Sequence, residues 1–217
     1  MNRNPTVLSA RVVLPVIVSA LILASLIVIL RSRSGNGASV IGSPAPVLSL
    51  VSLIDANEPD AEPNPALDLN AIDVAKLSLE DRVTVLHFWG TWCPPCKAEY
   101  PELVKRMGER ASNPVLQFIS VSTEGGEDET YEGLREKTQK YYETIEATGL
   151  TTYADANGVT RQASATILNR PFIVYPTTLV IDQNAKVAGL WQGFTRESVD
   201  EMIATVDRLL GTQPPST

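Results

Sequence analysis

The sequence predicts an α/β fold in which helices flank a mixed central β-sheet, preceded by a single N-terminal transmembrane helix. Three observations support this prediction. The chain has 217 residues, 44% of them hydrophobic, which suffices for the core of one ordinary domain plus extensions. A long uncharged apolar run lies near the N-terminus. Beyond it, the segments follow the order strand–helix–strand–helix and then strand–strand–helix, which indicates a parallel βαβ unit followed by an antiparallel hairpin and a covering helix.

The apolar run Val12–Leu30 contains about 19 residues, and a helix of that length crosses a hydrocarbon core of about 30 Å. The apolar region of a secretory signal is usually shorter, about 7–15 residues, so we expect an uncleaved signal anchor. Residues 1–11 would form a short tail and residues 31–39 a flexible linker. The small residues of Gly35–Ser39 leave cleavage by a peptidase as the alternative.

The charge distribution bears on location and partners. Two arginines precede the apolar run and two follow it, so the positive-inside rule barely favours either orientation. The free amino terminus favours an N-terminus in the cytoplasm, and the short tail fits that arrangement. The rest of this single-pass chain would then lie on the extracytoplasmic, periplasmic side, where disulfides persist. The formal net charge of −7 argues against nucleic acid as a partner, because an acidic surface repels phosphate groups.

We assign the globular domain to residues 40–213, followed by a tail at 214–217. Its first strand lies within Val40–Leu53, where apolar and small polar residues alternate after a proline. Residues 55–66 follow as an acidic, proline-containing loop, because they lack apolar periodicity. Asp73–Arg82 is then expected to form a short helix or turn.

The βαβ unit is expected next. Val83–Trp89 is a short, β-rich apolar run, typical of a strand buried on both faces. The following residues favour a helix from Pro94 to about Arg110, since prolines are tolerated in the first turn of a helix. Val115–Ser122 repeats the buried-strand pattern, and Tyr131–Gly149 is an amphipathic helix that ends at a glycine.

The C-terminal part of the chain predicts a hairpin and a last helix. Tyr175–Asp182 and Val187–Phe194 are strand-like runs on either side of a turn. Thr195–Gly211 closes the domain with a helix capped by Thr195, with Glu197 in its first turn. We assign no element to residues 150–174.

The only two cysteines of the chain, Cys93 and Cys96, lie where the buried strand ends and the next helix begins. The positive end of the helix dipole favours an anion there, so we expect Cys93 to be an exposed, acidic nucleophile. Cys96 lies one turn further along, within disulfide reach and more covered, where it would resolve a mixed disulfide. A redox pair is therefore the favoured interpretation of this spacing.

Two other uses of the cysteine spacing stay open but are disfavoured. A closed zinc site needs about four ligands, whereas the chain supplies two cysteines and one histidine, His87, within a buried strand. A purely structural disulfide closing so short a loop would add little stability. We therefore expect neither a metal ion nor another cofactor.

The segment Phe88–Leu103, "FWGTWCPPCKAEYPEL", together with Tyr175–Asp182, "YPTTLVID", resembles the thioredoxin superfamily. More narrowly, the chain is similar to the membrane-tethered TlpA/ResA/DsbE branch. The resemblance extends from about Gly42 to the final helix, so it implies a thioredoxin-like fold for the whole domain. The conjunction of Trp-Cys-x-x-Cys, a proline five residues after the second cysteine and a late Pro-Thr-Thr makes the resemblance specific.

The resemblance implies roles for the matching residues. Cys93 would be the nucleophile and Cys96 the resolving thiol of a redox-active disulfide. Trp92 would flank the site and contact the substrate. Pro176 would be a cis-proline that faces the cysteines, with the backbone of Tyr175 binding an incoming substrate chain. Within the helix, the resemblance implies a kink at the proline of position 101.

Glu99 lies three residues after Cys96, where the ResA and DsbE branch carries a buried acidic residue. Helix periodicity places Glu99 on the face of Cys96 and Leu103, and a carboxyl in an apolar site has a raised pKa that suits a proton shuttle. An ordinary surface glutamate is the alternative.

His87 departs from the resemblance, because thioredoxins carry an aspartate at this strand position and the TlpA-like branch usually an asparagine. A lone histidine in a strand is more often a core residue with satisfied hydrogen bonds than a catalyst. An imidazole beneath the cysteines could nevertheless tune their pKa values.

The expected function is thiol–disulfide exchange with protein dithiols or disulfides outside the cytoplasm. By resemblance the chain reduces rather than oxidises, with the cysteines of apocytochrome c as a candidate substrate and a membrane electron donor for recycling. The alternative is a tethered interaction module whose cysteines are incidental. A peroxidase of the peroxiredoxin kind needs threonine or serine three residues before its attacking cysteine, where this chain has Gly90. Copper delivery of the Sco kind needs a wider cysteine spacing and a later histidine, which this chain lacks.

Overall fold

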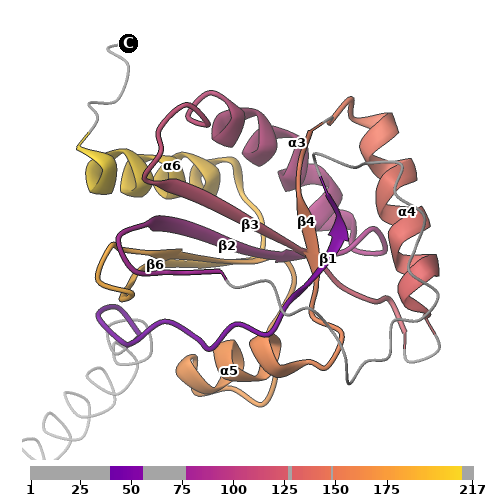
Figure 1. The fold of residues 1–217 in the computed structure, drawn as a ribbon, viewed down its shortest axis with the longest axis horizontal. Coiled ribbons are helices and arrows are strands. Elements are labelled where there is room, and N and C mark those ends of the chain that lie inside the picture. Colours follow the sequence, from indigo (N-terminus) through magenta and orange to yellow (C-terminus); the bar gives the residue numbers. More distant parts are fainter. Residues whose placement is uncertain (1–39, 56–76, 127–128, 148, 212–217) are drawn as a thin grey trace, which may run out of the picture. The chain divides into compact units, whose positions relative to one another are not determined.

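The structure of the protein is a computed structural model that describes residues 40–55, 77–126, 129–147 and 149–211 (Figure 1). The predicted transmembrane helix, the linker, most of the acidic loop and the C-terminal tail lie outside the described residues. Among the residues that are described, no helix has the length and apolar character needed to span a membrane.

Within the described ranges, six strands form one mixed sheet in the order β1-β4-β3-β2-β5-β6. The two central pairings, β2 with β3 and β3 with β4, are parallel, and the remaining three are antiparallel. The strands are β1 (Val51–Ile54), β2 (Val83–Trp89), β3 (Leu116–Ser122), β4 (Thr152–Ala154), β5 (Thr177–Ile181) and β6 (Val187–Gln192). This arrangement confirms the predicted parallel βαβ unit and the antiparallel hairpin.

Four helices in the described residues pack on the sheet: α3 (Pro94–Gly108), α4 (Tyr131–Thr144), α5 (Val159–Ile167) and α6 (Arg196–Leu210). Figure 1 shows α3, α4 and α6 on one side of the sheet and α5 on the other. Thr195 caps α6 as expected, in a reciprocal capping box with Ser198. The prediction of helices on both faces of a mixed sheet is therefore confirmed.

Helix α4 is shorter than the sequence predicts. Its last residue is Thr144, whereas the expected end was Gly149. Glu146 adopts a positive φ of 54°, and the N–H of Ala147 donates to the carbonyl oxygen of Tyr142. The chain thus leaves the helical path before it reaches the glycine, because a left-handed residue ends a helix whatever its identity.

The prediction also lacked two elements between residues 150 and 174, β4 and α5. Strand β4 has only three residues, too few to display an alternation. Helix α5 buries Thr160, Ser164 and Ala165 rather than large apolar side chains. The helix has only nine residues, and the small and hydroxylated residues of its inward face are also typical of loops, so the segment lacked a long apolar pattern.

Strand β2 is the centre of the core, and all seven of its residues are buried. Since successive side chains point to opposite faces, Leu86 and Phe88 pack with the cluster that includes residues of α5. Val85 and Trp89 pack with residues of α3 on the other face. Helix α3 covers that face with a stripe at helical spacing, formed by Cys96, Glu99, Tyr100, Leu103 and Met107. The strand predicted to be buried on both faces is confirmed.

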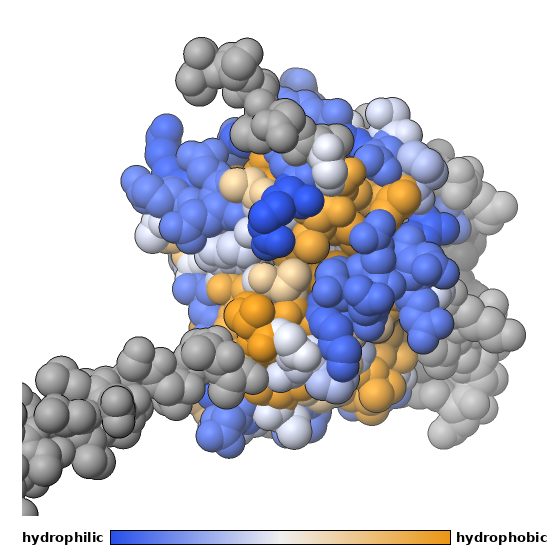
Figure 2. All heavy atoms as spheres, turned by 90° about the vertical axis from the view of Figure 1, so that its left-hand side faces the viewer, coloured by the Kyte–Doolittle hydropathy of each residue, from blue (hydrophilic) through white to orange (hydrophobic). Residues whose placement is uncertain are grey.

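The two ends of the sheet differ. Figure 2 shows the end at which β2 begins, where hydrophilic residues surround a central apolar area. The opposite end, where β2 stops and α3 starts, carries the two cysteines. The site described below therefore lies at the carboxyl end of the central parallel strands, a common location for functional sites in α/β folds.

Candidate active site

Cys93 and Cys96 form a disulfide at the start of α3, with a sulfur–sulfur distance of 2.05 Å. Cys93 is the N-cap of the helix, and its sulfur accepts a hydrogen bond from the backbone N–H of Cys96 at 3.3 Å. Pro94 and Pro95 occupy the first helical positions, where no intrahelical donor is lost. The pair thus lies at the positive end of the helix dipole, as predicted.

The cysteines are more covered than expected. Cys93 is 3% exposed and Cys96 is fully buried. Both belong to the core cluster that contains Trp89, and Tyr175 packs against that cluster. The expectation of an exposed Cys93 is therefore wrong for this disulfide form, in which both cysteines are part of the core.

Trp92 flanks the disulfide in a position set by two glycines. A Cβ atom at Gly90 would lie 2.3 Å from Trp92 Nε1, and one at Gly125 would lie 2.9 Å from Trp92 Cδ1. The indole N–H donates to the carbonyl oxygen of Thr123 at 3.0 Å, and the ring is 45% exposed. Trp92 therefore presents a fixed apolar surface beside the cysteines.

The Tyr175–Pro176 peptide bond is cis, as the resemblance implies. The ring of Tyr175 meets that of Trp92 edge to face, with centroids 5.1 Å apart. The segment before the proline is unusually apolar for a surface, since Phe172 is 69% exposed and Val174 is 38% exposed. Trp92 and the segment ending at Pro176 thus bring together residues that are far apart in the sequence.

Glu99 is fully buried, on the same face of α3 as Cys96 and Leu103. This position confirms the helix periodicity argument and contradicts the alternative of a surface glutamate. Neither carboxyl oxygen has a hydrogen-bond partner in the described structure. Burial raises the pKa of Glu99 to about 8, so the carboxyl group is largely protonated and uncharged at neutral pH.

His87 is fully buried in β2, and its side chain points toward α3. Its Nδ1 lies 2.9 Å from Thr178 Oγ1 on the paired strand β5. Its Nε2 lies 3.9 Å from Glu99 Oε2 and has no hydrogen-bond partner in the described structure. Burial lowers the pKa of His87 to about 3, so the imidazole is neutral at physiological pH. The alternative of a core histidine with satisfied hydrogen bonds thus holds for only one of the two ring nitrogens.

An aromatic cluster that the sequence did not predict packs in the same part of the core as the cysteines. Trp89 stacks on Tyr100 with ring centroids 3.9 Å apart. The Tyr100 hydroxyl lies 2.6 Å from both Ser120 Oγ and Tyr142 Oη, and Trp89 Nε1 donates to Ser120 at 2.9 Å. These bonds link α3, β3 and α4 directly beside the cysteines. The partners are distant in sequence, so no local pattern indicated the cluster.

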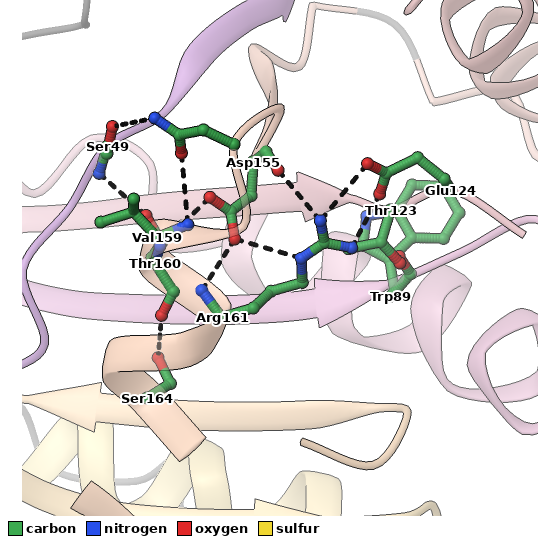
Figure 3. Close-up of polar contacts among 10 residues, drawn as sticks. Ser49, Trp89, Thr123, Glu124, Asp155, Val159, Thr160, Arg161 and Ser164 are labelled. Atoms are coloured by element: carbon green, nitrogen blue, oxygen red, sulfur yellow. Dashed lines mark hydrogen bonds and ion pairs between the residues drawn. The ribbon is translucent and has the colours of Figure 1, made fainter. Parts of the chain in front are cut away.

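A second missed cluster joins α5 to the end of β3 (Figure 3). Asp155 is 1% exposed and accepts from the backbone N–H groups of Thr160 and Arg161 at 3.1 and 2.7 Å. The Arg161 guanidinium binds Asp155 at 3.2 Å and Glu124 at 2.8 and 3.3 Å. Burial lowers the pKa of Arg161, but Glu124, Tyr175 and Asp155 together raise it above its ordinary value. Arg161 is therefore charged, and it connects α5 to Glu124 just after β3.

The described residues contain no group of three or more histidine, cysteine, aspartate or glutamate side chains arranged to hold a metal ion. His87, the only histidine of the sequence, is bound to Thr178. The arrangement offers two sulfur atoms in a disulfide and, on the same helix face as Cys96, a buried carboxyl group.

Comparison with known proteins finds thiol–disulfide oxidoreductases among the proteins that this chain is similar to. The AhpC/TSA family matches residues 51–189. The thiol-disulfide oxidoreductase ResA of Halalkalibacterium halodurans is 27% identical over 140 residues, which is 64% of this chain and 70% of ResA. The thiol:disulfide interchange protein DsbE of Pseudomonas aeruginosa is 35% identical over 49 residues, or 20% of this chain and 27% of DsbE. A thiol:disulfide interchange protein of the thioredoxin family from Chlorobium tepidum TLS has the same fold, with a TM-score of 0.52 at 20% identity over 78% of this chain and 98% of that chain.

Proposed function

The chain belongs to the AhpC/TSA family, and we propose that it is a membrane-anchored enzyme that reduces protein disulfides outside the cytoplasm. Its relatives and its Cys93–Cys96 disulfide make it a thiol–disulfide oxidoreductase. The observation that best supports the proposed mechanism is the fully buried Glu99 carboxyl group, which lies on the same helix face as Cys96 and has no hydrogen-bond partner among the described residues. Gly90 stands where a peroxidase of the peroxiredoxin kind needs threonine or serine, which disfavours that chemistry.

The proposed reaction starts from the reduced enzyme. The Cys93 thiol loses its proton to solvent, and the thiolate attacks one sulfur of a substrate disulfide. A bond forms between that sulfur and Cys93, the substrate disulfide breaks, and its other sulfur leaves as a thiolate that takes a proton. The Cys96 thiolate then attacks the Cys93 sulfur, which releases the second substrate thiolate. Two electrons have passed to the substrate, and the enzyme holds the disulfide of Cys93 and Cys96.

Glu99 carries the proton of Cys96 in this proposal. Cys96 is fully buried, so its thiol has to give its proton to a group inside the protein before the sulfur can attack Cys93. Burial raises the pKa of Glu99 to about 8, so a fraction of Glu99 is ionised near neutral pH, and this ionised form accepts the proton of Cys96. In the reverse direction, protonated Glu99 returns the proton to Cys96 when the disulfide opens.

Trp92, Tyr175 and Pro176 would bind the substrate polypeptide. The backbone of Tyr175 would pair with an extended chain, as strand addition at an exposed segment does in many peptide complexes. The exposed side chains of Trp92, Phe172 and Val174 would contact apolar residues around the substrate cysteine. Such contacts suit unfolded or partly folded proteins, which present apolar side chains beside their disulfides.

The resemblance to the membrane-tethered TlpA/ResA/DsbE branch supports reduction rather than oxidation, with the cysteines of apocytochrome c in cytochrome c maturation as a substrate. The predicted anchor at residues 12–30 would hold the domain at the membrane on the periplasmic side. A membrane electron donor would then return two electrons to Cys93 and Cys96 after each turnover.

The test is to trap the substrate. In the full chain carrying Cys96→Ser, the mixed disulfide on Cys93 cannot be resolved, so substrates should accumulate as covalent adducts that reducing agents release. Mass spectrometry of the adducts identifies them, with Cys93→Ser as the matched control that should trap none. Absence of adducts from cells in either redox state would support the alternative, a tethered interaction module.

The direction of the reaction has its own test. A reductant needs a low reduction potential, and we expect the Cys93–Cys96 couple to lie well below that of the strongly oxidising members of the fold, about −120 mV. Equilibration of the full chain with glutathione buffers, followed by thiol counting, measures this potential. A value above about −150 mV would contradict the reductive proposal and leave only the exchange activity.

A further inference from the structure

His87 has one ring nitrogen whose role the reaction above does not explain. The side chain is fully buried, and its Nδ1 is held by Thr178 Oγ1 at 2.9 Å. Its Nε2 has no hydrogen-bond partner in the described structure. Buried polar atoms are nearly always paired, because an unpaired one has lost its bonds to water without replacement. An unpaired nitrogen in the core therefore requires an explanation.

The nearest charged or chargeable group is the Glu99 carboxyl, whose Oε2 lies 3.9 Å from His87 Nε2. Both Glu99 oxygens are also unpaired among the described residues. The two side chains thus face each other across a gap about 1 Å longer than a hydrogen bond of about 2.9 Å. Rotation of the flexible Glu99 side chain would close a gap of this size without movement of the backbone.

We infer that the Thr178 hydroxyl donates to Nδ1 of His87, and that the Nε2–H of His87 donates to the Glu99 carboxylate whenever Glu99 has given up its proton. The inference rests on the proposed function, in which Glu99 carries the proton of Cys96. His87 is then a positioning residue. It stabilises and orients the ionised form of Glu99, and both side chains are fully buried. The protonated form needs no such donor, which agrees with the long distance in the structure.

Other groups around the pair leave this role to His87. Tyr100 on α3 has its ring centroid 5.7 Å from the imidazole, but its hydroxyl is bonded to Ser120 and Tyr142. Asp207, the buried carboxylate of α6, is bound by both arms of Arg110 at 2.7 and 2.8 Å. The side chains that β3, β5 and α6 pack on this face of the described structure include several without a titratable group: Phe118, Ser120, Thr178, Val180, Val199, Met202, Ile203 and Val206.

The test measures the protonation of Glu99 directly. Infrared difference spectroscopy of the full chain detects the carboxylic acid carbonyl band of Glu99, identified by its loss in Glu99→Gln. His87→Leu removes the donor, and we expect the pH midpoint of the band to rise by about 1 pH unit or more. His87→Gln keeps an N–H near the Nε2 position and should restore part of the difference. Thr84→Val is the matched control, because Thr84 is a buried, unpaired hydroxyl on the other face of the same strand.

A second readout follows the chemistry. A mixed disulfide between Cys93 and thionitrobenzoate releases a coloured thiolate when Cys96 attacks. The pH midpoint of this release should rise in His87→Leu by the same amount as the infrared midpoint. In the Glu99→Gln background, His87→Leu should leave the pH profile unchanged, because the residue through which His87 acts is absent.

Thr178→Val tests the same inference without removing the imidazole. Without the threonine donor, Nδ1 keeps the ring proton in part of the population, and the Glu99 midpoint should rise by less than in His87→Leu. An unchanged or lowered midpoint in both folded variants would overturn the inference. Because the infrared titration needs no substrate, it decides the role of His87 even if the full chain proves inactive on protein disulfides, a result that would count against the proposed function alone.

Discussion

At the scale of single residues, the position of Trp92 depends on the absence of side chains around it. The indole lies against Gly90 and Gly125, both of which a Cβ atom would bring within 3 Å of the ring. Its N–H donates to Thr123, whose own N–H and hydroxyl donate to the Trp89 carbonyl oxygen at 2.9 and 2.8 Å. The surface offered to a substrate is thus fixed to the end of the central strand.

Gly90→Ala should displace Trp92, because the new methyl group would lie 2.3 Å from Trp92 Nε1. Loss of one hydrogen bond and of the ordered ring is expected to lower kcat/KM for a protein disulfide by up to about 10-fold. Tryptophan fluorescence and steady-state kinetics of the full chain measure both effects.

Gly108→Ala is the control for that change. Gly108 belongs to the same helix as the cysteines, but nothing lies within 4 Å of its Cβ position. Alanine there should leave the activity unchanged and stabilise α3 by up to about 1 kcal/mol. If Gly90→Ala kept both the parent fluorescence and the parent activity, the argument for a fixed Trp92 would be wrong.

Sequence reasoning predicted the face of α3 but not what lies opposite that face. Helical spacing alone placed Glu99 with Cys96 and Leu103, and all three are buried. The bond that orients His87 could not be predicted, since Thr178 lies 91 residues further along the chain. Contacts of that separation depend on which strands become neighbours, and a single sequence without a local pattern carries no such information.

At the scale of elements, α5 depends on polar anchoring more than on apolar packing. Its N-cap is Gly158, which contributes no side-chain bond. The N–H of Val159 donates to Asn157 instead, and the next two N–H groups donate to Asp155. Arg161 then connects this carboxylate to Glu124, two residues beyond the end of β3 (Figure 3). This type of element is difficult to predict from sequence, because the residues that stabilise it are also typical of loops.

Arg161→Met should lower the free energy of unfolding by about 2–4 kcal/mol, because it leaves the buried Asp155 carboxylate without its cationic partner. Arg170→Met is the matched control: Arg170 is exposed just beyond α5, and its replacement should change stability by less than about 0.5 kcal/mol. Denaturant unfolding of the full chain measures both variants. Equal stability of the two would show that the ion pairs of Arg161 add nothing to the fold.

At the scale of the whole molecule, His87 and Glu99 make stability depend on pH in opposite directions. Folded Glu99 keeps its proton up to about pH 8, whereas in the unfolded chain it loses the proton near its ordinary pKa of 4.5. Unfolding therefore releases a proton between these values, and rising pH favours the unfolded state. Unfolded His87 takes up a proton below its ordinary pKa of 6.5, but folded His87 does so only near 3, so falling pH favours unfolding in that range.

The two effects oppose each other between about pH 4.5 and 6.5, so we expect a plateau of stability there. Above pH 6.5, Glu99 acts alone and should lower the free energy of unfolding by about 2 kcal/mol by pH 8, since one proton changes it by at most about 1.4 kcal/mol per pH unit. Denaturant unfolding of the oxidised full chain at pH 5.5, 6.5 and 8 measures this decrease.

Glu99→Gln should remove the decrease above pH 6.5, because glutamine has no proton to release. Glu102→Gln, which changes an exposed glutamate one turn away on the same helix, should retain it. A decrease of the same size in all three proteins would assign the pH dependence to other groups.

The pairing of β2 with β5 also determines when the site can exist. His87 and Thr178 are 91 residues apart, and the ring contact between Trp92 and Tyr175 joins segments separated by a similar length of chain. At a synthesis rate of about 5–20 residues per second, the cysteines emerge roughly 5–20 seconds before the segment that completes their surroundings. During that interval both thiols are carried on an incomplete sheet, without Thr178 behind His87 or Tyr175 beside Trp92. Until it is complete, the new chain thus exposes two thiols to the same thiol–disulfide exchange that the folded enzyme catalyses.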